Sequence, residues 1–103
     1  MGVIAEQGTA GPAIRLEGVV DIGSAAELKA RLLEALGSGA PTEVVLEGLT
    51  GLDVTTLQLL TAAETAARIR GAAWRRSGAM PESLRAAAAE AGWPALPFAG
   101  DGA

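Results

Sequence analysis

The order of strand-like and helix-like segments constrains the fold of this chain more than any other feature of its sequence. Residues 13–18 alternate apolar and polar side chains, which is the period of a half-buried strand. Residues 43–46 form the short, β-branched and continuous run expected of a central strand buried on both faces. A helical pattern follows each strand, over 24–37 and 53–70. Because strands that alternate with helices build parallel sheets through right-handed crossovers, the sequence predicts an α/β domain.

Further elements are predicted before and after this pattern. The apolar run 3–5 is expected to pair with 13–18 as an antiparallel hairpin. The segment 48–52 is predicted to be a loop, and 72–75 a fourth strand. A third helix begins near Pro81, a residue suited to the first helical position, and stops at Gly92.

Two aromatic residues are placed by the same reasoning. Trp74 is expected to fill space in the core or at the sheet edge, with Arg75 and Arg76 in solvent; the alternative is an aromatic and basic contact patch. Trp93 opens the tail 93–98, which is expected to dock as a last short strand.

The length of 103 residues suits one domain of ordinary size. We predict a single domain over 1–103, with its core at about 3–98 and a frayed end at 99–103. The fold class is α/β: a four- to five-stranded mixed, mainly parallel sheet packed by three or more helices.

The first helix has the clearest terminal signals. Ser24 followed by Glu27 has the spacing of a capping box, in which each side chain satisfies a free main-chain N–H. Glu27 and Arg31 are spaced for a surface ion pair, and Gly37 is expected to supply the left-handed stop. The apolar stripe that faces the core consists of Leu28, Leu32 and Leu36.

The chain contains no Cys and no His, which excludes the usual zinc sites, a thiolate nucleophile and the commonest general base. We expect no metal, no cofactor and no catalytic residue. An enzyme would need a carboxylate or Lys29 with a shifted pKa as its base, and Lys29 lies among ordinary charges within a predicted helix.

Charge and hydropathy exclude two further classes of partner. The net charge of -4 argues against a nucleic-acid surface, which needs clustered positive charge. No apolar run reaches the length of about 20 residues that a membrane span requires, and no signal peptide is recognisable. We therefore expect a cytoplasmic protein without direct membrane insertion.

The segment 52–57 is the most informative for function. Asp53, Thr55 and Thr56 lie at a predicted helix start, where free main-chain N–H groups and the helix dipole favour negative charge. A phosphate on a hydroxyl here would be tolerated locally and would change the charge of a surface patch. The local signal by itself favours the simpler interpretation, that Asp53 caps the helix and the threonines fill its first turn. In a parallel sheet this segment meets 19–24, which follows another strand.

Four stretches together resemble a STAS domain (sulfate transporter and anti-sigma factor antagonist). Residues 16–22 and 24–28 are similar to the opening of the family, 43–49 to its central strand and following loop, and 52–60 to its signature loop and helix. The resemblance covers about residues 3–98 and includes the order of the elements.

The resemblance implies a non-catalytic signalling module that is similar to an anti-sigma factor antagonist. Such proteins dock a kinase-type anti-sigma factor or a related signalling kinase, which phosphorylates the signature loop and is thereby released; a phosphatase restores the active form. The partner-binding residues that the resemblance implies here are Asp21, Asp53, Val54, Thr55, Thr56 and Gln58. For Asp21 an equal alternative is the role of a turn residue before the first helix.

The signature loop departs from the family pattern at the phosphorylated position. Val54, which has no hydroxyl, stands where the antagonist subgroup has its phosphorylated Ser or Thr, directly after Asp53. Thr55 and Thr56 are therefore the phosphorylation candidates, Thr56 at a position that is commonly Gly. Either a threonine has taken over the role, or the chain binds its partner without a switch.

A second function is compatible with the same resemblance. Some stand-alone STAS proteins are accessory subunits of ABC-type lipid-transport complexes, where they hold an ATPase subunit in place. Neither the net charge nor Val54 separates this alternative from signalling.

Overall fold

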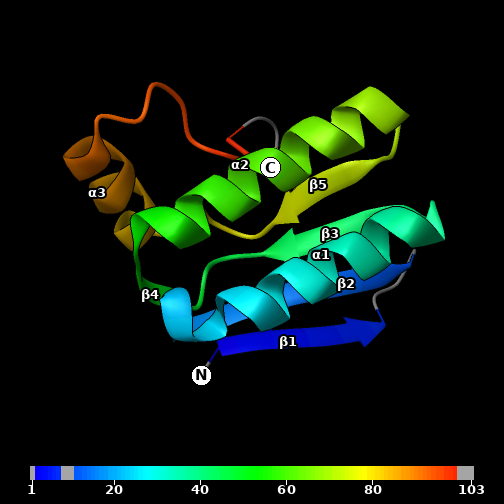
Figure 1. The fold of residues 1–103 in the computed structure, drawn as a ribbon, viewed down its shortest axis with the longest axis horizontal. Helices are drawn as coiled ribbons and strands as arrows, with labels where there is room; N and C mark the ends of the chain where they lie inside the picture. Colours follow the sequence, from blue (N-terminus) through cyan, green and yellow to red (C-terminus); the bar gives the residue numbers. More distant parts are fainter. Residues whose placement is uncertain (1, 8–10, 100–103) are drawn as a thin grey trace.

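The computed structural model describes residues 2–7 and 11–99, in which five strands form one sheet (Figure 1). β1 (Gly2–Gln7) pairs antiparallel with β2 (Pro12–Val20), which confirms the predicted hairpin. All other pairings are parallel: β2 with β3 (Thr42–Val45), β2 with β4 (Leu49–Leu52), and β3 with β5 (Trp74–Ser77). The predicted mixed, mainly parallel sheet is confirmed. Of the predicted frayed end, residues 100–103 lie outside the described part.

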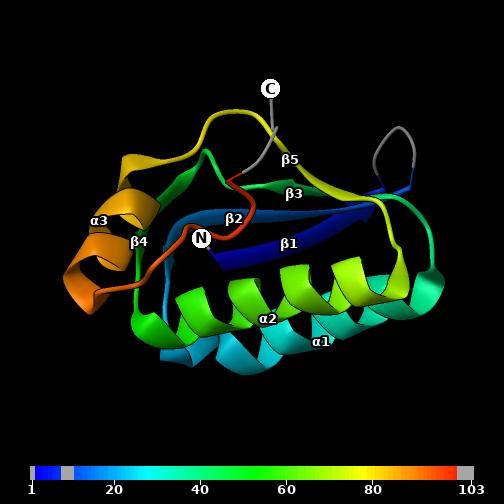
Figure 2. The same ribbon diagram turned by 90° about the horizontal axis from the view of Figure 1, so that it is seen from above.

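Two long helices cover one face of the sheet. α1 (Ala25–Ser38) and α2 (Val54–Arg70) lie side by side below it in Figure 2. α3 (Glu82–Ala91) packs at the end of the sheet against β4, and a short 3₁₀ turn, η1 (Ile22–Ser24), leads from β2 into α1. Among the described residues, no helix combines the length and the hydropathy that a membrane span requires.

The core lies between the sheet and the two long helices. Each leucine buried there contributes about 1.5–3 kcal/mol through the hydrophobic effect. The predicted stripe of α1 is buried, and α2 contributes a second one. The fully or almost fully buried members of the core include Ile14, Leu16, Val20, Leu28, Leu32, Val44, Leu46, Leu57, Leu60 and Leu84.

Three predictions about the strands were wrong. The predicted loop 48–52 contains β4, which is four residues long and pairs with the end of β2 beyond a bulge between Gly18 and Val19. β3 is not buried on both faces, because the helices cover one face and leave Glu43 and Val45 half-buried on the other. The tail 93–98 docks without forming a strand.

The ends of the helices also differ from the predictions. The capping box does not form, because Ser24 belongs to η1 and its side chain makes no capping hydrogen bond. α1 continues through Gly37 and ends at Gly39, which adopts the left-handed conformation with φ 70°. Pro81 precedes α3 as its N-cap, so it is not the first helical residue.

Candidate docking site

The loop after β2 and the first turn of α2 are tied together by two hydrogen bonds. The main-chain N–H of Ile22 donates to Asp53 Oδ2 at 3.0 Å. The hydroxyl of Thr56 donates to the main-chain oxygen of Val20 at 2.9 Å. The two segments predicted to meet at the carboxyl end of the sheet therefore do so, and their relative positions are fixed by these contacts.

Asp53 is the centre of this arrangement. It is the N-cap of α2, as predicted, and its Oδ1 accepts the main-chain N–H of Thr56 at 3.0 Å. These bonds favour the ionised carboxylate, so the pKa of Asp53 is lowered, mainly by the main-chain N–H of Thr56 and further by the Thr56 hydroxyl and the N–H of Ile22. The Asp53 carboxylate thus already accepts the main-chain N–H of Thr56, one of the N–H groups at the helix start that the sequence analysis considered favourable for a phosphate.

Asp21 shapes the neighbouring loop. It is exposed and is the N-cap of η1, where its Oδ1 accepts the main-chain N–H of Gly23 at 3.0 Å. The turn that carries Ile22 is therefore held by carboxylates on both sides, its own loop's Asp21 and Asp53 of α2.

The exposed side chains around Asp53 are partly apolar. Val54 is 46% exposed and Ile22 is 72% exposed. Gln58, one helical turn after Val54, is also exposed, and Thr55 is half-buried. We call the residues Asp21, Ile22, Val54, Thr55 and Gln58 the docking surface.

Thr56 does not belong to the docking surface. Its residue is fully buried and its hydroxyl is bonded to the main chain of Val20. In this conformation it can contact neither a partner protein nor the active site of a kinase. Its burial therefore disagrees with its predicted roles in partner binding and phosphorylation, and Thr55 is the remaining phosphorylation candidate.

Ile22 was not among the predicted partner-binding residues, although its main chain bonds Asp53 directly. The signal in the sequence was a large apolar residue between two turn-forming residues, Asp21 and Gly23, where burial is not expected. The described residues hold no cluster of acidic side chains that could bind a metal ion.

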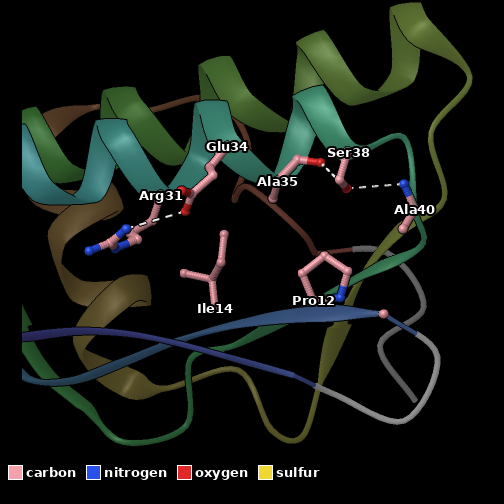
Figure 3. Close-up of a pocket in the computed structure, with 8 residues that line it drawn as sticks. Pro12, Ile14, Arg31, Glu34, Ala35, Ser38 and Ala40 are labelled. Atoms are coloured by element: carbon pink, nitrogen blue, oxygen red, sulfur yellow. Dashed lines mark hydrogen bonds and ion pairs between the residues drawn. The ribbon is translucent and has the colours of Figure 1, made fainter.

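A separate pocket lies at the far end of α1, away from the docking surface (Figure 3). It has a volume of about 360 Å³ and lies between the C-terminal half of α1 and the start of β2. Its floor is apolar, and an ion pair of 3.2 Å between Arg31 and Glu34 lies at its side. None of the predicted site residues lines it; the lining residues are Gly11, Pro12, Ile14, Arg31, Glu34, Ala35, Ser38 and Ala40.

Comparisons with known proteins agree with this architecture. The family model described as "Mlab, STAS domain" matches residues 4–96. A solved structure, "Structure of the Anti-Sigma Factor Antagonist SpoIIAA in its Unphosphorylated Form", has a TM-score of 0.65 and 19% sequence identity, over 82% of this chain and 80% of that chain. At this identity the likeness shows a common fold. No curated protein sequence gives a significant match.

Proposed function

Because this chain belongs to the STAS domain family, we propose that it is a non-catalytic, cytoplasmic protein-binding module that resembles an anti-sigma factor antagonist. The sequence resemblance to the family and the predicted fold class are both confirmed. The proposed partner is a kinase-type anti-sigma factor or a related signalling kinase, and the proposed contact is the docking surface.

The observation that carries this proposal is the pair of exposed apolar side chains, Ile22 and Val54, on either side of Asp53. Single exposed apolar residues are ordinary on protein surfaces. Here, however, the main chains of both residues are held in place by the Asp53 carboxylate and the helix it caps. A preorganised apolar contact rimmed by polar residues loses little entropy on binding, which favours a protein interface.

Phosphorylation of Thr55 would act on this surface through charge. It would add about 1.5–2 negative charges between exposed Val54 and buried Thr56, close to the ionised Asp53. The like charges would repel each other, and a charged group would lie at an apolar contact. We therefore propose that phosphorylation of Thr55 releases the partner and that a phosphatase reverses the step.

The exposure of Val54, which the sequence alone did not reveal, favours the second candidate function, an accessory subunit of an ABC-type lipid-transport complex. Val54 occupies the position directly after Asp53 and exposes an apolar side chain where the antagonist subgroup carries a hydroxyl. An apolar contact without a switch suits a permanent subunit interface.

Binding measurements with matched variants test the docking surface. Val54→Asp places a charge in it, whereas Ile69→Asp changes a residue that is 80% exposed near the opposite end of α2. Against a purified candidate kinase or ABC ATPase encoded beside the gene, we expect Val54→Asp to weaken binding at least about tenfold and Ile69→Asp to leave it unchanged. Equal affinities of wild type and Val54→Asp for the partner would contradict the proposed surface.

The two functions are separated by the identity of the protein that binds and by the fate of ATP. A kinase that binds and transfers phosphate to Thr55 supports the signalling function. An ABC ATPase that binds while Thr55 stays unmodified supports the transport function.

A further inference from the structure

In the segment after α3, the residue Phe98 contacts both the sheet and α2. The segment turns back from α3 and runs beside β5 and α2 (Figures 1 and 2). The main-chain N–H of Phe98 donates to Glu64 Oε2 at 3.0 Å, and Arg76 Nη1 donates to the main-chain oxygen of Phe98 at 2.7 Å. The ring of Phe98 stacks on Trp74 with 6.4 Å between ring centroids and 16° between planes. Arg76 was predicted to lie in solvent, and this prediction was wrong. Arg75 is exposed, as predicted.

We call Glu64, Trp74 and Arg76 the Phe98 seat. It binds the main-chain N–H, the main-chain carbonyl and the ring of one aromatic residue, which lies in a turn of the chain. Pro97, before Phe98, is also fully buried. The chemistry of the seat is therefore that of a peptide-binding site, and residues 97–98 are its present occupant.

Two features show that this occupant fits imperfectly. Phe98 has φ 57°, a left-handed conformation that is unfavourable for a residue other than glycine. The indole Nε1 of Trp74 is buried and has no acceptor among the described residues, which costs free energy because a buried donor is left unpaired. A ligand that relaxed the first feature and satisfied the second would bind the seat better than the tail does.

We propose that the Phe98 seat is a second docking site, for a peptide segment of a partner protein that carries an aromatic residue, and that the chain's own Pro97–Phe98 occupies it as an intramolecular competitor. The partner segment presents an aromatic side chain to Trp74, its main-chain N–H and C=O to Glu64 and Arg76, and an additional acceptor to the Trp74 indole. The seat is distinct from the docking surface, because Glu64 lies about 15 Å further along α2 than Val54.

Release of the occupant exposes the buried side chains of Pro97 and Phe98 but leaves Trp93 in place. Trp93 is held separately, because its indole N–H donates to Thr61 Oγ1 of α2 at 3.1 Å. Residues 97–99 can therefore leave the seat while the segment stays anchored at Trp93.

A peptide competition experiment with the full chain tests the proposal. In the Phe98→Ala variant the occupant of the seat has lost its ring. A peptide with the sequence of 96–99 (Leu-Pro-Phe-Ala) is added in trans, with Leu-Pro-Ala-Ala as the control peptide. The side-chain N–H signal of Trp74 is followed by NMR. We expect the first peptide alone to shift this signal, and wild type to need at least about tenfold more peptide because its own tail competes.

Two matched substitutions in the Phe98→Ala chain locate the binding. Arg76→Met removes the donor to the peptide carbonyl, whereas Arg75→Met changes the exposed neighbouring arginine. We expect Arg76→Met to weaken peptide binding about tenfold and Arg75→Met to leave it unchanged. No shift of the Trp74 signal at about millimolar peptide, equal shifts with both peptides, or equal effects of the two arginine variants would each overturn the proposal.

A measurement on the wild-type chain decides the question if Phe98→Ala fails to fold. Occupation by a competitor requires that the tail opens without global unfolding, so the amide of Phe98 must exchange with solvent at least about tenfold faster than that of Leu16 in the core of β2. Equal protection of the two amides would show that the tail opens only when the whole domain unfolds, and would overturn the proposal.

Discussion

The hydroxyl of Thr56 and the carbonyl of Val20 form a buried hydrogen bond of 2.9 Å across 36 residues of sequence. Thr56 lies in the first turn of α2 and Val20 is the last residue of β2. The same hydroxyl is 3.1 Å from Asp53 Oδ1, so one side chain contacts both segments that present the docking surface. Because the bond is shielded from water, its loss leaves polar atoms without a replacement partner.

We therefore expect Thr56→Val to destabilise the domain by about 1–3 kcal/mol, although valine has nearly the same shape as threonine. The carbonyl of Val20 would remain buried without this donor. Thr56→Ser keeps the hydroxyl, so we expect its free energy of unfolding to stay closer to that of wild type than to that of Thr56→Val. Urea unfolding of the three proteins measures the differences, and a Thr56→Val variant as stable as wild type would contradict the assigned role of the bond.

Asp53 makes stability depend on pH in a defined direction. Its pKa is lowered from the ordinary value of 3.8 in the folded chain, so the folded state binds the proton less tightly than the unfolded state does. The stabilisation is present above the unfolded pKa and is lost as the pH falls through the lowered folded pKa. Asp53→Ala removes the cap and is expected to cost about 0.5–2 kcal/mol at neutral pH.

The difference between wild type and Asp53→Ala should shrink as the pH falls below about 4, because protonated Asp53 is a poorer acceptor for its N–H donors. Free energies of unfolding measured between about pH 2 and 7 give this difference directly. A difference that stays constant to the lowest pH would show that the carboxylate charge contributes nothing to the cap.

The parts of the fold that depend on local chemistry could be predicted from the sequence. α2 begins after Asp53 and ends before Gly71, as predicted, because an acidic cap and a left-handed glycine (φ 71°) act within a few residues of the helix end. The ion pairs Arg31–Glu27 and Arg68–Glu64 form at 3.8 Å and 3.9 Å, as their spacing within a helix indicates.

The parts of the fold that depend on partners distant in the sequence could not be predicted in this way. β4 contains Thr50 and Gly51, which have no strand pattern of their own, and it becomes a strand because its main chain pairs with the end of β2. The burial of Thr56 likewise depends on a carbonyl 36 residues away. For this reason the sequence predicted that the segments 19–24 and 52–57 meet, but not that Thr56 is buried.

Gly78 occupies a position that other residues would fill poorly. Its φ is 88°, and a Cβ at this position would lie 2.8 Å from Glu47 Oε2. We expect Gly78→Ala to destabilise the domain by about 1–2 kcal/mol, from backbone strain together with displacement of the Glu47 side chain. Gly37→Ala is a suitable control, because Gly37 lies within α1 and an added Cβ there would meet open space. That control should be neutral or stabilising in thermal unfolding; equal effects of the two variants would contradict the explanation.

The Val54→Ser substitution distinguishes a phosphorylation site that has moved to Thr55 from a phosphorylation site that is absent. Val54 is 46% exposed in the first turn of α2, so replacing it with serine should change stability by no more than about 0.5 kcal/mol. The new hydroxyl follows Asp53 directly, where the antagonist subgroup is phosphorylated. With the purified partner kinase and ATP, we expect phosphate on Thr55 in wild type, none in Thr55→Ala, and phosphate at position 54 in the double variant Val54→Ser/Thr55→Ala. Mass spectrometry maps the site in each case. If the double variant is phosphorylated and wild type is not, the kinase recognises the loop but Thr55 has not replaced the usual acceptor, and the proposed Thr55 switch is wrong.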